Sequence, residues 1–474
     1  MAFKDIRDFI SRLEAEGEVQ RMEQEVDWNL EVGAITRRSN EAGLPAPLFQ
    51  KIKGYPSSHR IFSEALSNHR RIAIAMNLDP DTPVKELILE YLKRKQQPIK
   101  PVSVTGGPCK ENIRIGGDVN LLEFPVPLIH QGDGGRYIGT WHVTICKDLE
   151  TGWVNWGMYR HMLHDRNHIG MLAGPPTHAR RIMKSWEDKG SPMEIAIAIG
   201  VEPISTFCAA APVPYGISEV DMVGGMRGEP MELIKCETVD LEVPATSEIV
   251  IEGEVLTDRM MDEGPFGEYT GYAGGHREPR LVIRVKAVTF RNEPILTMMN
   301  EGMPVSSTHA TQSVTRSAEC YEMLRGLGMP VTGVYEFAEA CTLLVVVAVK
   351  RGLVRADEIA YGIWSSRLRA NTPYVIVVED DVDPTDLKQV VHAVVSKCHP
   401  YRGIVKIERT VGTALMPFLS RYEQRHHLGA KAYFDCTWPS DWDPADVPQR
   451  CSFDQAYPQD IQQKALAAWR RYGY

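Results

Sequence analysis

The chain has 474 residues, of which 43% are hydrophobic, and its formal net charge is −9. This length corresponds to about three domains and buries a large core without disulfides or structural metals. The composition excludes disordered, collagen-like and coiled-coil proteins, and the negative charge argues against a nucleic-acid binder. A small anion would therefore have to be held by a few local cations.

The nine cysteines are scattered and form no CxxC pair. This pattern argues against zinc ribbons and thioredoxin-type sites and indicates reduced, mostly buried thiols. The amino terminus is amphipathic and charged, without the apolar region of a secretory signal, and the longest apolar run, residues 343–349, is too short to cross a bilayer. We therefore expect a cytoplasmic protein with no membrane partner.

The first 110 residues predict an α/β region. Apolar residues recur at helical spacing in 3–17, 30–42 and 83–95, and short strands are expected near 48–56 and 60–66. The Pro- and Gly-rich stretch 98–108 marks a linker.

Residues 111–312 predict a β-rich domain, because short strand-like runs alternate with turns around one expected helix near 178–189. Residues 313–450 predict a smaller α/β domain. Its expected helices span 315–327, 355–368 and 386–397, and its expected strands span 332–337, 342–349 and 374–379. Residues 451–474 form a tail with a last helix near 460–471.

Common catalytic signatures are absent, including the P-loop, the GxSxG elbow, HExxH and the dinucleotide-binding GxGxxG. The sharpest remaining motif places Glu263 and Glu268 on either side of a Gly-Pro-Phe-Gly turn. Two carboxylates brought together in a shielded site repel, so one is expected to hold a proton and to act as a general acid. The alternative is a surface turn with two solvated glutamates.

A second motif, Asn155-Trp-Gly-Met-Tyr-Arg160, puts an amide and a guanidinium into a strand-like run. Arg160 offers a bidentate fork for a carboxylate or phosphate. The alternative is a strand arginine in a surface ion pair.

Histidines follow at His161, His164 and His168, where strand gives way to turn and solvated side chains are common. His178 differs, because Pro175-Pro176-Thr177-His178 predicts a helix start and Arg180 and Arg181 follow it. A helix amino terminus with arginines is a plausible anion cradle. From the residues alone, nothing connects Asn155, His178 and Glu219.

Taken in order, these motifs resemble the UbiD family of reversible decarboxylases, which use prenylated FMN. The likeness runs over essentially the whole chain, and several collinear motifs are more specific than any one of them. They are Phe124-Pro-Val-Pro, His130-Gln-Gly-Asp-Gly-Gly-Arg136-Tyr137, Asn155-Trp-Gly-Met-Tyr-Arg160, Thr177-His178, Ile217-Ser-Glu219, Lys235-Cys-Glu-Thr, Val243-Pro-Ala-Thr-Ser-Glu248, Glu248-Ile-Val-Ile-Glu-Gly-Glu254, Glu263-Gly-Pro-Phe-Gly-Glu268 and Trp469-Arg-Arg-Tyr-Gly-Tyr474.

The resemblance implies a cofactor site. Asn155, His178 and Glu219 would ligate a divalent ion, Mn²⁺ or Mg²⁺, that clamps the cofactor phosphate, and such a ligand set suits these ions. A K⁺ ion would use backbone carbonyls around residues 209–211 and near Trp153. The remaining cofactor contacts implied are Trp156, Gly157, Met158, Tyr159, Arg160 and Thr177, with Lys431 reaching the phosphate.

The resemblance also implies the chemistry. Arg160 would hold the substrate carboxylate, Glu268 would deliver the proton that replaces CO₂, and Glu263 would orient Arg160 and tune Glu268. The substrate would be an aromatic, heteroaromatic or α,β-unsaturated carboxylic acid. Thr308, His309 and Gln312 would face it, and the polar Gln312 favours an acid with a hydrogen-bonding group or ring heteroatom.

By the same resemblance the fold is α+β, with a central split β-barrel of the flavin-reductase type and a carboxy-terminal α/β oligomerisation domain. A homodimer or hexamer is expected, with a flavin prenyltransferase supplying the cofactor. Two rivals stay open at this point. One is an oxidoreductase that uses ordinary FMN in the split barrel, and the other is a non-catalytic cofactor-binding subunit.

Overall fold

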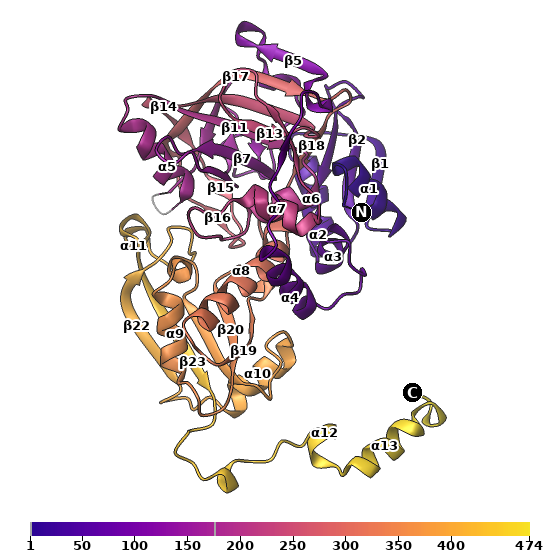
Figure 1. The fold of residues 1–474 in the computed structure, drawn as a ribbon, viewed down its shortest axis with the longest axis vertical. Helices are drawn as coiled ribbons and strands as arrows, with labels where there is room; N and C mark the ends of the chain where they lie inside the picture. Colours follow the sequence, from indigo (N-terminus) through magenta and orange to yellow (C-terminus); the bar gives the residue numbers. More distant parts are fainter. Residues whose placement is uncertain (1, 175–176) are drawn as a thin grey trace.

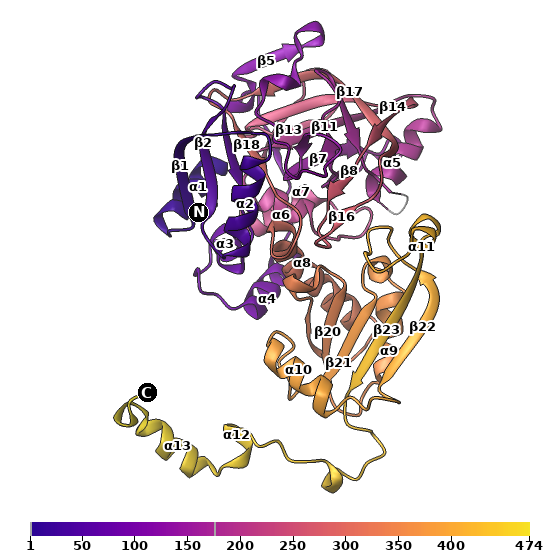
Figure 2. The same cartoon turned by 180° about the vertical axis from the view of Figure 1, so that it is seen from behind.

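The computed structural model describes residues 2–174 and 177–474, which form a mixed α/β fold (Figure 1). The amino-terminal and central sheets lie together in one large body. Helix α8 (Ser307–Gly326) leads from this body into the carboxy-terminal sheet, which forms a second, smaller body (Figure 2).

The amino-terminal region is a four-stranded sheet with helices around it. The order is β1-β2-β3-β18, and the last strand comes from residues 295–298, which pair in parallel with β3. The region therefore takes a strand from far outside residues 1–110. Its elements are α1 (Ile6–Ala15), β1 (Val19–Val26), α2 (Glu31–Glu41), β2 (Ala46–Ile52), β3 (Arg60–Ser63), α3 (His69–Ala75), α4 (Val84–Lys95) and β18 (Ile295–Met298).

Helix α1 illustrates why these segments fold as they do. The side chain of Asp5 accepts a hydrogen bond of 2.9 Å from the Asp8 amide and so caps the helix. The buried positions of α1 are Ile6, Phe9, Ile10 and Leu13. These positions share one face of a helix, so the prediction for residues 3–17 is confirmed, as are those for 30–42 and 83–95.

A seven-stranded sheet dominates the centre, in the order β10-β17-β14-β11-β7-β8, with β5 paired to β17. Within the residues that the structure describes, no pairing joins β10 to β8, so this sheet is open at both edges. Its strands are β5 (Asn112–Ile115), β7 (His142–Lys147), β8 (Val154–Gly157), β10 (His168–Met171), β11 (Met193–Ile199), β14 (Ile249–Glu263) and β17 (Glu278–Phe290).

Shorter elements complete the central region. They are β4 (Val102–Ser103), β6 (Tyr137–Gly139), β9 (His161–Met162), α5 (His178–Glu187), α6 (Pro203–Ala209), α7 (Glu219–Arg227), β12 (Glu232–Lys235), β13 (Glu242–Pro244), β15 (Phe266–Gly267) and β16 (Ala273–Gly274). The expectation of a single helix here is wrong, since α6 and α7 are present too. All of α6 is buried, as is most of α7, so neither carries the amphipathic period that predicts a surface helix.

The carboxy-terminal sheet has the order β19-β20-β21-β23-β22, with β20, β21 and β23 parallel. Helix α8 begins at Ser307 rather than at Thr315, because its first two turns are buried but polar and show no apolar period. It crosses the boundary expected at 312/313. The remaining elements are β19 (Val331–Tyr335), β20 (Leu344–Val349), α9 (Ala356–Trp364), β21 (Tyr374–Glu379), α10 (Leu387–Ser396), β22 (Ile404–Val411), α11 (Arg421–His426) and β23 (Leu428–Cys436).

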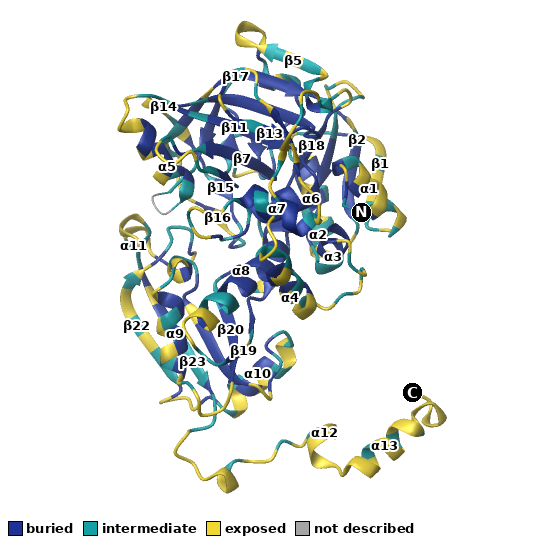
Figure 3. Cartoon of the chain, in the orientation of Figure 1, coloured by how far each residue is buried: buried dark blue, intermediate teal, exposed yellow. Residues whose placement is uncertain are grey.

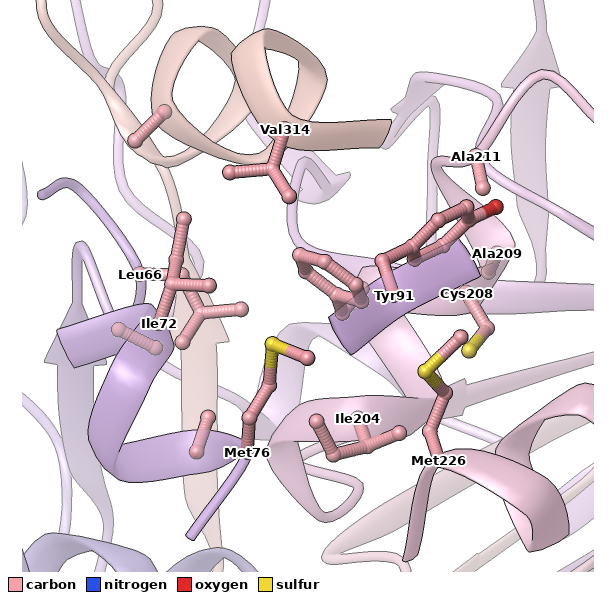
Figure 4. Close-up of a cluster of buried hydrophobic side chains, with 14 of the residues drawn as sticks. Leu66, Ile72, Met76, Tyr91, Ile204, Cys208, Ala209, Ala211, Met226 and Val314 are labelled. Atoms are coloured by element: carbon pink, nitrogen blue, oxygen red, sulfur yellow. The ribbon is translucent and has the colours of Figure 1, made fainter. Parts of the chain in front are cut away.

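Buried residues lie where these regions meet, around α6, α7 and the start of α8 (Figure 3). In the largest cluster, Met76 and Tyr91 of the amino-terminal region pack with Ile204 and Met226 of the central region and with Val314 of α8 (Figure 4). This shared core fixes α8 against the large body.

The tail from residue 451 carries α12 (Phe453–Ala456) and α13 (Gln459–Ala467) and runs away from both bodies (Figure 1). All nine cysteines are free, and seven are buried, as predicted. Among the helices that the structure describes, none is long and apolar enough to cross a membrane.

Candidate active site

Arg160, Glu263 and Glu268 meet in one buried network, although Arg160 is more than 100 residues from either glutamate. Arg160 follows β8, and Glu263 is the last residue of β14. The guanidinium grips Glu263 in a bidentate pair, with Nε 2.9 Å from Oε1 and Nη2 3.0 Å from Oε2, and Nη1 donates to Glu268. The Glu263 side chain is fully buried, and those of Arg160 and Glu268 are 9% exposed. Neither a solvated turn nor a surface ion pair describes this arrangement.

The network sets the protonation of its members. Burial raises the pKa of Glu268 to about 7; Arg160 opposes this shift and Glu301 adds to it. For Arg160, burial disfavours the charge, but Glu263 and Glu268 outweigh it and raise its pKa. With Glu268 protonated, the three side chains carry no net charge, and an anionic substrate is not repelled.

Asn155, His178 and Glu219 also converge. Asn155 lies in β8, whereas His178 and Glu219 begin α5 and α7. Nδ2 of Asn155 is 2.8 Å from Oε1 of Glu219 and 3.4 Å from Nδ1 of His178, and Nδ1 of His178 is 3.9 Å from Oε1 of Glu219. Rotating the Asn155 amide would turn its oxygen towards the same point. The described residues contain no cluster of three His, Cys, Asp or Glu side chains suited to a metal. A metal bound here would therefore need the side-chain amide of Asn155 as its third protein ligand.

The residues expected to line the cofactor surround this point. The Trp156 ring is buried in the core while its amide donates to Oε2 of Glu219 at 3.0 Å. The Tyr159 hydroxyl accepts from the Ala179 amide at 3.1 Å. Gly157 packs against the Tyr159 ring, where a Cβ would lie 2.7 Å from it, and Met158 is partly buried against the main core.

Thr177 caps α5 by accepting from the Arg180 amide. Of the predicted helix start, Pro175 and Pro176 lie outside the described residues.

A cationic cavity of about 510 Å³ opens at the start of α5. It is lined by Thr177, His178, Arg180, Arg181, Lys184, Glu187, Tyr215 and Arg367. Arg367 comes from the carboxy-terminal domain and was not predicted. No local pattern marks it, because its neighbours in the cavity are distant in sequence.

Lys431 does not line this cavity. It is buried on β23, with Nζ 5.4 Å from the centre of the Trp364 ring. Burial lowers its pKa to about 8, and the nearby charge of Arg369 adds to this shift. Arg367 is the cation of the carboxy-terminal domain that lines the same cavity as His178.

The start of α8 approaches the same region. Nε2 of His309 lies 2.5 Å from the Tyr269 carbonyl, next to Glu268, while its Nδ1 accepts from the Ser306 amide at 2.9 Å. Thr308 is buried, with Oγ1 2.9 Å from the sulfur of Met299. Gln312 is partly buried one turn further on.

Leu415 is a second residue that sequence reasoning missed. A Cβ added to Gly274 would lie 2.4 Å from Cγ of Glu268 and 3.1 Å from Cδ2 of Leu415. The loop after β22 therefore brings an apolar side chain from the carboxy-terminal domain to the neighbourhood of Glu268.

The expectation of solvated histidines is wrong for His161. Its ring is fully buried, with Nε2 2.9 Å from Thr144 Oγ1 and Nδ1 3.0 Å from the Gly170 carbonyl. Burial lowers its pKa to about 4, which makes it a neutral core residue. His164 and His168 are partly exposed.

Comparison with known proteins places this geometry in a family. Sequence models of the 3-octaprenyl-4-hydroxybenzoate carboxy-lyase N-terminal domain, Rift-related domain and C-terminal domain match residues 10–90, 100–304 and 309–436. The chain is 31% identical to pyrrole-2-carboxylic acid decarboxylase of Pseudomonas aeruginosa, over 99% of this chain and 98% of that protein. It is 34% identical to ferulic acid decarboxylase 1 of Saccharomyces cerevisiae, with the same coverage.

The fold agrees. An evolved dimeric form of the UbiD-class enzyme HmfF from Pelotomaculum thermopropionicum, solved in complex with prFMN, superimposes with a TM-score of 0.80 and 28% identity, over 94% of this chain and 97% of that one. Family models, relatives and fold cover nearly the full length. The chain therefore belongs to the UbiD family of carboxy-lyases.

Proposed function

We propose that this protein is a non-oxidative decarboxylase of an aromatic, heteroaromatic or α,β-unsaturated carboxylic acid, acting with prenylated FMN and a divalent ion. The observation that carries the proposal is the buried Arg160–Glu263–Glu268 network, in which one carboxyl group with a pKa of about 7 can hold a proton. The named activities of the two relatives, on pyrrole-2-carboxylic and ferulic acid, support this reaction class.

The residues fit the cofactor and ion. The amide, imidazole and carboxylate of Asn155, His178 and Glu219 form a donor set suited to Mn²⁺ or Mg²⁺. The adjoining cationic cavity, lined by Thr177 at the start of α5 and by Arg367, suits a phosphate group. This local charge explains how a chain with net charge −9 would hold an anion.

Prenylated FMN, when bound, supplies an electron sink for the carbon that loses CO₂. The protein supplies the rest. Arg160 uses three N–H groups on the two glutamates, and a guanidinium has five, so two remain to orient the substrate carboxylate. Glu268 then gives its proton to that carbon, and Glu263 keeps Arg160 in place.

The substrate would lie near Glu268, His309 and Leu415. Thr308 and Gln312 add polar groups from α8, and this polarity favours an acid with a ring heteroatom or hydroxyl. We further propose that the central sheet is a split barrel of the flavin-reductase type, that K⁺ binds near residues 209–211 and that the protein assembles at least as a dimer. The dimeric, prFMN-bound HmfF variant supports the last point.

The proposal is tested by making the protein with and without a co-expressed flavin prenyltransferase, because the chain has no evident motif for building the extra flavin ring. We expect turnover of conjugated acids only after co-expression and exposure to oxygen, without nicotinamide. Equal turnover by protein carrying unmodified FMN would refute the mechanism. A nicotinamide-dependent bleaching of bound flavin would favour the oxidoreductase alternative.

A further inference from the structure

The turn that carries both catalytic glutamates is held from outside by another segment of the chain. We call residues 263–268 the acid turn and residues 130–137 the clamp. The two touch at three successive points. The Gly267 amide donates to Oδ1 of Asp133 at 2.9 Å, the Gly134 amide donates to the Pro265 carbonyl at 2.7 Å, and the Tyr137 hydroxyl donates to Oε1 of Glu263 at 2.7 Å.

The contact leaves no space between the two segments. A Cβ on Gly134 would lie 1.9 Å from the Gly264 carbonyl oxygen, and a Cβ on Gly267 would lie 2.4 Å from the His130 ring. Between these points the Tyr137 and Phe266 rings pack with centroids 4.2 Å apart. The acid turn therefore cannot shift without moving the clamp.

The clamp is itself anchored. The Asp133 side chain is 2% exposed and accepts from the His130 amide at 3.0 Å, and its carboxylate lies 3.1 Å from Nδ1 of His130. Nε2 of His130 is 2.8 Å from Oδ1 of Asn300, whose amide nitrogen donates to the Gly33 carbonyl at 2.7 Å. This chain of contacts ties the acid turn to the amino-terminal region.

We propose that Asp133 and Tyr137 are positioning residues of the decarboxylase. Asp133 holds the backbone next to Glu268, and Tyr137 holds the carboxylate of Glu263 against Arg160. The inference rests on the proposed function for its catalytic meaning, but the contacts themselves do not depend on it.

Replacing Asp133 and replacing Tyr137 should affect the reaction in different ways. Asp133 fixes position, and a displacement of about 1 Å in a catalytic group costs about 100-fold in rate. Tyr137 also acts on charge, because its hydroxyl donates to the Glu263 carboxylate and so screens that negative charge from Glu268. Without that hydroxyl the Glu263 charge repels an ionised Glu268 more strongly and neutralises Arg160 more fully, and both effects raise the pKa of Glu268.

The charged and titratable groups around the glutamates are few. Arg160, Glu263, Glu301 and Tyr269 interact electrostatically with Glu268. Arg160, Tyr137 and His164 do so with Glu263. The clamp adds the Asp133 carboxylate and the His130 ring, which lie against Gly267, and Asp133→Asn removes the first of these charges.

The test uses Asp133→Asn and Tyr137→Phe in the full chain loaded with cofactor. Asp133→Asn should lower kcat by about 10- to 100-fold at pH 6, where the acid form of Glu268 predominates, with KM and cofactor occupancy near wild type. Tyr137→Phe should move the alkaline limb of kcat/KM to higher pH, so that its activity relative to wild type is lowest at pH 6 and rises towards pH 8.

Matched controls are available far from the acid turn. Tyr91 is a buried tyrosine whose hydroxyl donates to Oε1 of Glu319 at 2.9 Å, so Tyr91→Phe removes a similar bond. Asp383 accepts from the Thr385 amide at 2.9 Å, as Asp133 does from Gly267. Tyr91→Phe and Asp383→Asn should leave the pH profile and kcat unchanged.

A second readout does not need activity. Infrared difference titration of the cofactor-free protein follows the Glu268 carboxyl band, assigned by its loss in Glu268→Gln, and Tyr137→Phe should raise its midpoint. If the wild type turns over no acid, the proposed function fails while this titration still decides the clamp. An unshifted midpoint in Tyr137→Phe, or a wild-type kcat in Asp133→Asn, would overturn the inference.

Discussion

Replacing Glu268 by Gln tests the role of its acidic proton while the packing is kept. The amide has nearly the same shape as the carboxyl group but no acidic proton to transfer. Burial raises the pKa of Glu268 from 4.5 to about 7. The folded protein thus binds this proton more tightly than the unfolded chain, so the associated stability is complete below the unfolded pKa and is lost as the pH rises through 7. At about 1.36 kcal/mol per pKa unit, the shift corresponds to about 3 kcal/mol.

Urea denaturation of the cofactor-free protein, followed by tryptophan fluorescence, measures this difference. Between about pH 5 and pH 8 we expect the wild type to lose up to about 3 kcal/mol of stability relative to Glu268→Gln. Glu301 also has a pKa raised to about 7 by burial, but it titrates in both proteins, so its contribution largely cancels. Parallel stability curves would show that Glu268 does not hold the proton.

The same variant tests the chemistry. Cofactor-loaded Glu268→Gln should keep its cofactor and lose about 10²- to 10⁴-fold in turnover, the usual contribution of a general acid. The wild type should lose about tenfold per pH unit well above 7, as the acid form is depleted. Turnover within a few-fold of wild type would transfer the acid role elsewhere, with Glu263 the first candidate.

Three further predictions follow from the site. His178→Ala or Glu219→Ala should lose divalent ion and cofactor together, and full cofactor absorbance in both would contradict the ligand assignment. Gln312→Ile should shift preference towards less polar or cinnamate-like acids, whereas an unchanged ranking in a panel would place α8 outside the pocket. Arg367→Met should weaken cofactor retention measured by equilibrium dialysis more than Lys431→Met does, and the reverse order would restore Lys431 as the phosphate contact.

Local pattern predicts the elements that have one polar and one apolar face. Helices α1, α2 and α4 follow from the spacing of apolar residues. Helices α6 and α7 do not, because burial on nearly all sides erases the period. Local patterns also do not predict the pairing of β18 with β3, because the paired residues are more than 200 positions apart in the sequence.

The contacts of the Arg160–Glu263–Glu268 network are also beyond what local sequence patterns predict. The Glu263/Glu268 motif predicts a carboxylate pair, but nothing within either motif says that Arg160 closes on it. The resemblance to a family supplied that link, and the structure brings the three residues together.

The predicted phosphate contact Lys431 and the unpredicted Arg367 lie at different places in the structure. Lys431 lies against the Trp364 ring, whereas Arg367 lines the cavity at His178. Both come from the carboxy-terminal domain, so only the packing of that domain on the large body decides which cation reaches the cavity.

Isotope exchange tests the central claim most directly, because it reports reversible carbon–carbon bond cleavage without any redox partner. Protein loaded with prenylated FMN is incubated with a conjugated acid and ¹³C-labelled CO₂, and the recovered acid is examined by mass spectrometry. The account predicts that the label enters the carboxyl group, that wild-type protein does this without nicotinamide and that Glu268→Gln does so far more slowly. Turnover of the acid without label exchange, or equal exchange by protein carrying only unmodified FMN, would contradict it.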